Sequence, residues 1–186
     1  MADSLTRSDF VPFKVGPYEV TGVLGAGSMG EVYAARDLRL EREVALKRIQ
    51  PERLDSETFR RFSREARAAA GLGHPAIVQI HDWLETDSGA WIVMERLVGQ
   101  SLADRLGEGS IPELSTAVRW AERLADGLAA AHSAGVVHRD LQAGNVMLTP
   151  GGGVRILDFG LAKIALAQGA RADRDGRPPS AAGLGA

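Results

Sequence analysis

A glycine-rich segment with strand-like sequence on both sides limits this chain to a small number of folds. Residues 25–32 read Gly-Ala-Gly-Ser-Met-Gly-Glu-Val, and glycines at these spacings let backbone N–H groups approach phosphate oxygens without an intervening Cβ. A dinucleotide-binding loop has the same glycine pattern but continues into a helix. Here Val32-Tyr33-Ala34-Ala35 follows, which is more typical of a strand. The pattern favours a β-hairpin folded over phosphates, with an ordinary glycine-rich turn as the alternative.

The first half of the chain is expected to form a small antiparallel sheet with one helix. Residues 18–49 contain three runs rich in valine, leucine and tyrosine, which predict three strands, and two further strands are expected at 77–83 and 91–95. Between these groups, apolar residues recur at three- and four-residue spacing over 56–70 and predict a helix of about four turns.

After residue 99 the pattern changes to helical. A short helix is predicted over 101–106 and a long one over 112–134, whose apolar residues share one side: Leu114, Val118, Ala121, Leu124, Ala125 and Leu128. Short apolar pieces broken by polar turns over 135–161 are typical of a loop-rich catalytic face. Residues 167–186 have a composition unable to bury a core and are expected to be a disordered tail. The fold class is therefore α+β, with a sheet lobe followed by a helical lobe.

Composition excludes several classes of function. The net charge of -2, from 22 basic and 24 acidic residues, provides no basic surface for nucleic acid or an anionic membrane. Cysteine is absent, which excludes disulfides, thiolate nucleophiles and cysteine-based zinc sites. The first twenty residues do not resemble a signal peptide, and no segment has the roughly 18–20 apolar residues that span a bilayer. A cytoplasmic location is expected.

A lysine at the end of an apolar strand is the first candidate for binding chemistry. Val44-Ala45-Leu46-Lys47 places an ammonium group where an unpaired charge is costly. Lysine occurs elsewhere only at positions 14 and 163. In combination with the glycine hairpin, we expect Lys47 to hold phosphate oxygens and Glu65, on the helix over 56–70, to orient it. A solvated lysine at a strand end is the alternative.

Three oxygen-bearing side chains on two loops are the second candidate for binding or catalytic chemistry. Residues 138–145 read His-Arg-Asp-Leu-Gln-Ala-Gly-Asn, and Asp158-Phe159-Gly160 follows thirteen residues later. The loops flank a predicted β-hairpin, which can bring Asp140, Asn145 and Asp158 into one pocket. Asn145 and Asp158 offer the hard oxygen ligands that suit Mg²⁺, and Asp140 is left to accept a proton. Ordinary turn chemistry is the alternative for each residue taken singly.

These motifs, in this order and spacing, resemble those of the protein kinase family. The surrounding sequence (VLGAGSMGEVY, REA, HPAIV, WIVME and AHSAGVVHRDL) is most similar to bacterial serine/threonine kinases, and the resemblance covers 18–163. It implies a five-stranded antiparallel N-terminal lobe with one helix, followed by an incomplete helical lobe. The implied divisions are a lead-in at 1–16, an ATP-binding lobe at 17–97, a partial C-terminal lobe at 98–165 and a tail at 166–186.

The resemblance also implies ATP and Mg²⁺ as cofactors and a role for each matching residue. Asp140 is the implied catalytic base, Glu65 pairs with Lys47, and Asn145 and Asp158 hold Mg²⁺. Met94 is implied at the back of the adenine pocket, with His138 and Phe159 packed together. The remaining ATP contacts are implied for the glycine hairpin and for residues around the adenine: Leu24, Gly25, Ala26, Gly27, Ser28, Gly30, Val32, Ala45, Glu95, Leu97 and Met147.

The sequence departs from the family pattern at two places. Gln142-Ala143 replaces the usual lysine and proline, and losing one donor to a transition state costs about 2.7–4 kcal/mol, or about 10²- to 10³-fold in rate. The sequence also continues past Lys163 without an activation segment or the later helices. We therefore expect a truncated kinase with impaired activity. The apolar side of the helix over 113–134 would be uncovered, which favours self-association or a docking partner.

Three hypotheses follow. The chain is an enzyme that transfers the γ-phosphoryl group of ATP to serine or threonine of a protein substrate. Alternatively, it is a nucleotide-binding pseudokinase that serves as an interaction module. The third hypothesis is a non-functional fragment, left by a shortened or frameshifted reading frame. Neither nucleic acid nor a membrane is expected as a partner.

Overall fold

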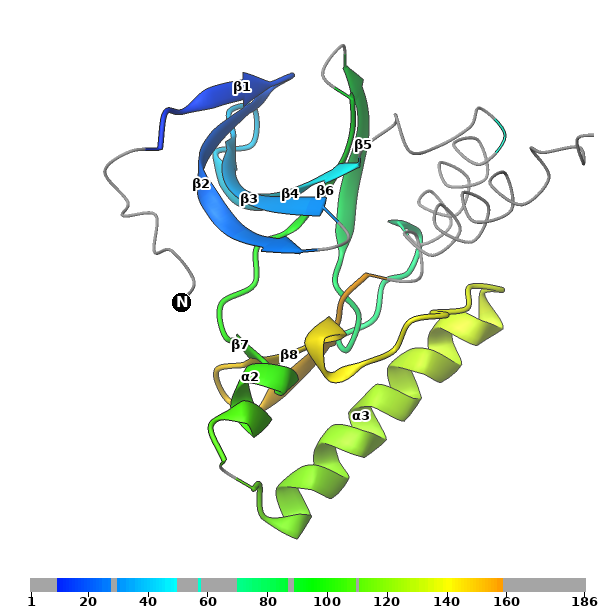
Figure 1. The fold of residues 1–186 in the computed structure, drawn as a ribbon. Helices are drawn as coiled ribbons and strands as arrows, with labels where there is room; N and C mark the ends of the chain where they lie inside the picture. Colours follow the sequence, from blue (N-terminus) through cyan, green and yellow to red (C-terminus); the bar gives the residue numbers. More distant parts are fainter. Residues whose placement is uncertain are drawn as a thin grey trace, which may run out of the picture.

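A curled antiparallel sheet forms the N-terminal part of the molecule (Figure 1). The computed structural model describes residues 10–27, 30–49, 57, 70–86, 89–109 and 111–158. The sheet has six strands in the order β1-β2-β3-β4-β6-β5, and neighbours in this order are antiparallel. Their bounds are β1 Phe13–Val15, β2 Tyr18–Gly27, β3 Gly30–Asp37, β4 Arg42–Ile49, β5 Ile80–Thr86 and β6 Gly89–Glu95.

The second part of the molecule contains the helices and a small three-stranded sheet. In Figure 1, α3 runs below the small sheet, and α2 lies between that sheet and the connection to α3. The small sheet has the order β7-β8-β9. The bounds in this part are β7 Gln100–Ser101, α2 Leu102–Gly107, α3 Leu114–Ser133, the 3-10 helix Ala143–Asn145, β8 Val146–Thr149 and β9 Gly153–Ile156.

The five predicted strands are all present, and the prediction of a five-stranded sheet is wrong by one strand. The additional strand is β1, within the segment that the sequence analysis treats as a lead-in. Phe13 of β1 lies opposite Val20 of β2, and the Phe13 ring meets Tyr33 edge-on with centroids 5.6 Å apart. Val15 is buried. Three residues are too few for a clear alternating pattern, so packing against the larger sheet determines this strand.

An ionic network holds the turn between β3 and β4. Asp37 is fully buried and accepts hydrogen bonds from the backbone N–H groups of Arg39 and Leu40. Burial opposes its ionisation, but those N–H groups and the charges of Arg39 and Arg42 hold the pKa of Asp37 below its usual value. The Arg39 guanidinium also donates to the Tyr18 hydroxyl at 3.1 Å. The network therefore connects the turn to β2.

The segment before β5 joins the two parts of the molecule. His74 Nε2 lies 3.2 Å from Asp126 Oδ2 on α3, and His74 Nδ1 accepts a hydrogen bond from the N–H of Ala76. Gly127 of α3 is buried, and a Cβ there would lie 3.2 Å from the side chain of Ile156. Ile77 forms a parallel bridge with Ile156 of β9. A single loop thus contacts both α3 and the small sheet.

Part of the apolar side predicted for the long helix is covered. Leu124 and Leu128 pack against a core cluster that contains Ala131 and Ile156, whereas Leu114 and Val118 are exposed. Among the described helices, none is long and apolar enough to cross a membrane.

Candidate active site

The glycine-rich segment forms a β-hairpin, as predicted. Gly25 lies opposite Val32, and Gly27 lies opposite Gly30, so strand pairing continues on both sides of the turn. Gly30 has a φ of +115°, and a Cβ at this position would lie 2.7 Å from the carbonyl oxygen of Arg48. Glycine is therefore required at position 30, because of the positive φ and because β4 approaches closely. Leu24 and Ala26 are exposed on β2, while Ser28 lies outside the described residues.

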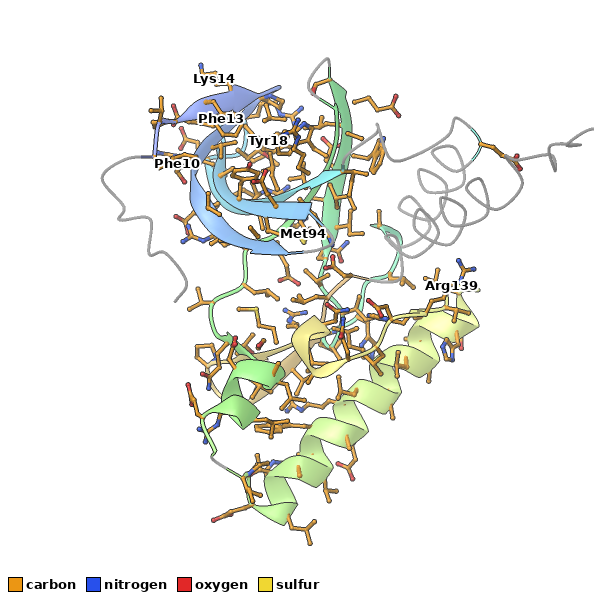
Figure 2. All side chains as sticks on the ribbon, in the orientation of Figure 1. Phe10, Phe13, Lys14, Tyr18, Met94 and Arg139 are labelled. Atoms are coloured by element: carbon orange, nitrogen blue, oxygen red, sulfur yellow. The ribbon has the colours of Figure 1, made fainter. Side chains whose placement is uncertain are left out.

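Apolar residues predicted to surround the adenine lie together behind the hairpin. Ala45 and Met94 belong to one buried cluster, against which Val32, Leu97 and Leu157 pack. In Figure 2, Met94 lies at the edge of the six-stranded sheet that faces the helical part of the molecule. Met147 lies half-buried on β8 and is not among the described residues that pack in this cluster.

Lys47 forms an ion pair with Asp158. Strand pairing places Lys47 opposite Val32 on one side and Ile92 on the other, which buries its side chain. Its Nζ atom lies 2.6 Å from Asp158 Oδ2, with side-chain exposures of 5% and 26%. A buried ammonium group requires an anion, and Asp158 supplies one. Glu65, the predicted partner of Lys47, lies outside the described residues, as does the helix predicted over 56–70 apart from positions 57 and 70.

Side-chain amides bind the carboxylate of Asp140. The Nδ2 group of buried Asn145 donates to the carbonyl oxygen of Asp140 at 2.9 Å and approaches its Oδ2 at 3.4 Å. The Nε2 group of Gln142 lies at the same 3.4 Å from Oδ2. Asp140 and Asn145 are thus held together, and the residue that departs from the family pattern contacts the predicted base.

His138 connects the two loops. This residue is buried, and its Nε2 atom lies 2.8 Å from the carbonyl oxygen of Leu157. Its Nδ1 atom accepts the N–H of Asp140 at 3.3 Å. Because a carbonyl oxygen can only accept, Nε2 carries the proton in this arrangement. Phe159, the predicted partner of His138, lies outside the described residues.

Left-handed backbone conformations occur at both loops of the site. Among non-glycine residues of the described chain, positive φ angles occur at Glu41, at Arg139 (+61°) and at Asp158 (+50°). Such conformations persist only where the surrounding structure enforces them, and they concentrate at functional sites. Figure 2 shows Arg139 in the loop above one end of α3. Two of these three residues therefore belong to the predicted site: Arg139 precedes Asp140, and Asp158 is itself a predicted ligand of Mg²⁺.

Asn145 and Asp158 lie on adjacent segments and offer an amide oxygen and a carboxylate. Val146 and Ile156 are paired between β8 and β9, and the N–H of Leu157 donates to the carbonyl oxygen of Asn145 at 2.8 Å. Asp158 therefore follows directly after a residue that contacts Asn145. Carboxylate and amide oxygens are ligands that Mg²⁺ accepts together with substrate phosphates. Within the described ranges, no group of three or more histidine, aspartate or glutamate residues could hold a metal independently of a substrate.

The sequence analysis missed one charged residue near the site. Arg155 of β9 forms an ion pair with Glu95 at 3.4 Å. The sequence analysis expects Glu95 only as one of the ATP contacts around the adenine, with no role for its ion pair. A signal for Arg155 was present, since it is a cation within the apolar run 154–157, just as Lys47 is within 44–47.

The fold and these residues together define a class of protein. A glycine hairpin, a buried lysine on a strand beside it, a loop that holds Asp140 against Asn145 and an aspartate after the next hairpin are arranged as the corresponding parts of a protein kinase. The protein kinase domain model matches residues 18–178, and the chain belongs to this family.

Bacterial serine/threonine-protein kinases are among its relatives. A probable serine/threonine-protein kinase of Streptomyces coelicolor is 41% identical over 155 residues, which are 80% of this chain and 23% of the relative. For PknD of Mycobacterium tuberculosis the identity is 40%, over 85% of this chain and 24% of the relative. PknA of the same species is 40% identical over 80% of this chain and 36% of the relative. The chain thus spans about a quarter to a third of these proteins.

Solved structures agree with this assignment. The kinase domain of PknI from M. tuberculosis superposes with a TM-score of 0.74 at 33% identity. The match covers 81% of this chain and 62% of that domain. The chain is thus similar to a large part of a bacterial serine/threonine-protein kinase domain.

Proposed function

We propose that this chain binds Mg-ATP and transfers the γ-phosphoryl group to a serine or threonine hydroxyl of a protein. The observation that carries the proposal is the ion pair of Lys47 with Asp158, next to a loop that holds Asp140 against Asn145. The hydrogen bond from the N–H of Leu157 to the carbonyl oxygen of Asn145 connects that loop to the segment of Asp158, which supports a single site formed by the four residues.

Each residue has a physical task in this proposal. Lys47 binds phosphate oxygens of ATP, and the backbone of the glycine hairpin covers them. Asp158 and the amide oxygen of Asn145 hold Mg²⁺, which when bound neutralises charge on the phosphates. The Asn145 Nδ2 group already donates to Asp140, so its Oδ1 atom is the one left for the metal.

Asp140 accepts the proton of the attacking hydroxyl. Its carboxylate is only partly buried, and amide groups of Asn145 and Gln142 approach the same oxygen, Oδ2. A carboxylate held beside the substrate in this way can accept a proton when it is ionised.

The test is transfer of label from γ-labelled ATP to a protein substrate, compared with Asp140→Asn. The variant keeps the shape of the side chain and removes the base, so transfer is expected to fall about 10²- to 10⁴-fold. Equal transfer by both proteins would contradict the proposal. ATP affinity, measured in parallel, is expected to be similar for the two proteins.

A second function, nucleotide binding without transfer, is favoured by one observation. Gln142 contacts Asp140 through an uncharged amide, where the family pattern has a cation that neutralises the transferring phosphate. This function predicts Mg-ATP binding with no transfer above that of Asp140→Asn.

A further inference from the structure

Arg155 lies between the two sheets and binds groups on both sides. It is half-buried on β9, a strand whose neighbouring residues Val154 and Ile156 are buried. Its Nη1 group donates to the carbonyl oxygen of Ile77 at 3.2 Å, and its Nη2 group lies 3.4 Å from Glu95 Oε2. One guanidinium therefore connects the small sheet to the loop before β5 and to the end of β6.

Glu95 is held by contacts from two segments. Its Oε1 atom accepts the N–H of Gln79 at 2.8 Å, while its own N–H donates to the carbonyl oxygen of Gln79 at 2.9 Å. Oε2 is the atom paired with Arg155. The side chain of Glu95 is 23% exposed, and that of Arg155 is 28% exposed. A pair at this depth is screened less than a surface ion pair.

The two residues that flank Ile77 in the loop before β5 both form backbone hydrogen bonds with β9. The N–H of Ile156 donates to the carbonyl oxygen of Ala76 at 2.7 Å, and the N–H of Val78 donates to the carbonyl oxygen of Ile156 at 3.0 Å. Asp158 follows two residues after Ile156. Glu95 begins residues 95–97, called here the adenine-edge segment because Glu95 and Leu97 are implied to contact the adenine. An ion pair and hydrogen bonds thus connect this segment with β9, the strand that leads to the proposed Mg²⁺ ligand Asp158.

We propose that Arg155 is a positioning residue that couples nucleotide binding at segment 95–97 to the placement of Asp158. This inference rests on the proposed function, since it requires a Mg-ATP site. Without the guanidinium, Glu95 keeps its Gln79 contacts, but β9 loses its ionic connection to the adenine-edge segment. We expect a loss of affinity for Mg-ATP only. The affinity lost is the share that depends on Asp158 and therefore on Mg²⁺ and the phosphates.

The experiment compares dissociation constants for ATP with Mg²⁺, ATP without Mg²⁺, and adenosine, by isothermal titration calorimetry. Arg155→Met is expected to weaken Mg-ATP binding about 2- to 30-fold, the usual range for residues that couple two sites. Adenosine binding should change by less, because adenosine has no phosphates. Arg155→Lys should recover part of the increase in ATP affinity that Mg²⁺ provides. Arg119→Met is the matched control, since Arg119 is exposed on α3 and bonds to Thr116 of the same helix.

Glu95→Gln completes a double-mutant cycle and has the same shape as the native side chain. If the two residues act as one unit, Glu95→Gln combined with Arg155→Met weakens Mg-ATP binding no more than the stronger single change. Thermal unfolding checks that each variant is folded, and Glu95→Gln carries the test if Arg155→Met does not fold.

Three outcomes overturn the coupling. The first is an unchanged Mg²⁺-dependent gain in ATP affinity for Arg155→Met and Glu95→Gln, and the second is strict additivity of their effects. Equal weakening of adenosine and Mg-ATP binding also contradicts it, since that result indicates damage to the adenine segment only. Failure of the wild-type chain to bind Mg-ATP refutes the proposed function and, with it, this inference.

Discussion

The ammonium group of Lys47 lies 2.6 Å from the carboxylate of Asp158. Lys47 belongs to β4 of the six-stranded sheet, whereas Asp158 follows β9 of the small sheet. The ion pair therefore joins the two parts of the molecule at the place where phosphates and Mg²⁺ are proposed to bind. The ion pair thus holds the proposed phosphate-binding lysine and the proposed Mg²⁺ ligand close together.

Lys47→Met is expected to weaken ATP binding about 10- to 100-fold. Methionine keeps an unbranched apolar side chain but cannot make charge-assisted hydrogen bonds, each of which contributes about 1.5–3 kcal/mol. Isothermal titration calorimetry with Mg-ATP measures the change. The matched control is Lys14→Met, because Lys14 is an exposed lysine on β1, far from Met94 in Figure 2. Wild-type affinity in Lys47→Met would contradict the role of this residue.

Gln142→Lys is expected to increase phosphoryl transfer by up to about 10²-fold, with ATP affinity nearly unchanged. A lysine ammonium group adds the positive charge that an amide lacks, and one added donor to a transition state has an effect of this size. Steady-state kinetics with labelled ATP separates kcat from KM. An unchanged kcat would show that Gln142 does not limit the reaction.

Gly99→Ala is expected to destabilise the fold by about 1–3 kcal/mol. Gly99 has a φ of +148°, and a Cβ there would collide with the carbonyl oxygen of Leu148 on β8. Urea unfolding measures the change in the free energy of unfolding. Gly107→Ala is the control, because Gly107 ends α2 with no atom within 4 Å of an added Cβ. A Gly99→Ala protein as stable as Gly107→Ala would contradict the assigned geometry.

The ionisation of Tyr33 gives a prediction about pH. Burial, followed by the hydrogen bond from its hydroxyl to Glu31 and the charge of Glu31, raises the pKa of Tyr33 to about 12. An unfolded tyrosine has a pKa of about 10. The folded state thus binds the phenolic proton more tightly, so this contribution to stability is complete below about pH 10 and is lost as the pH rises from about 10 to about 12.

Ultraviolet titration of tyrosinate in Tyr18→Phe checks this value, since the chain has 2 tyrosines and only Tyr33 then reports. The expected midpoint is about 12 in the folded protein and about 10 in denaturant. Circular dichroism shows over which pH range the protein is folded. A midpoint near 10 for the folded protein would contradict the buried, hydrogen-bonded environment of the phenol.

Local patterns were sufficient to predict most strands and the hairpin. The runs rich in valine, leucine and tyrosine over 18–49 and the glycine spacing in 25–30 depend on neighbours in the sequence, and the structure confirms the strands and the hairpin. The order of the motifs likewise predicted that Asp140 and Asn145 share a loop, and they are hydrogen-bonded.

Contacts between distant segments could not be predicted in the same way. The ion pair of Arg155 with Glu95 and the contact of His74 with Asp126 join residues more than fifty positions apart. No local spacing encodes such partners, because the packing of the two sheets and α3 determines them. The short strand β1 was missed for the same reason: Phe13 and Val15 become a strand through their contacts with β2, Tyr33 and Trp91.

The most direct test of a Mg-ATP site built on Lys47 and Asp158 is a thermal-shift titration with Mg-ATP. Ligand at about 100 times its Kd stabilises the folded state by about 2.7 kcal/mol, which raises Tm by about 5–10 °C in a chain of this size. We predict this shift for the wild-type chain and its loss in Lys47→Met and Asp158→Asn at the same concentration. An absent shift in the wild-type chain, or an equal shift in all three proteins, would contradict the site described above.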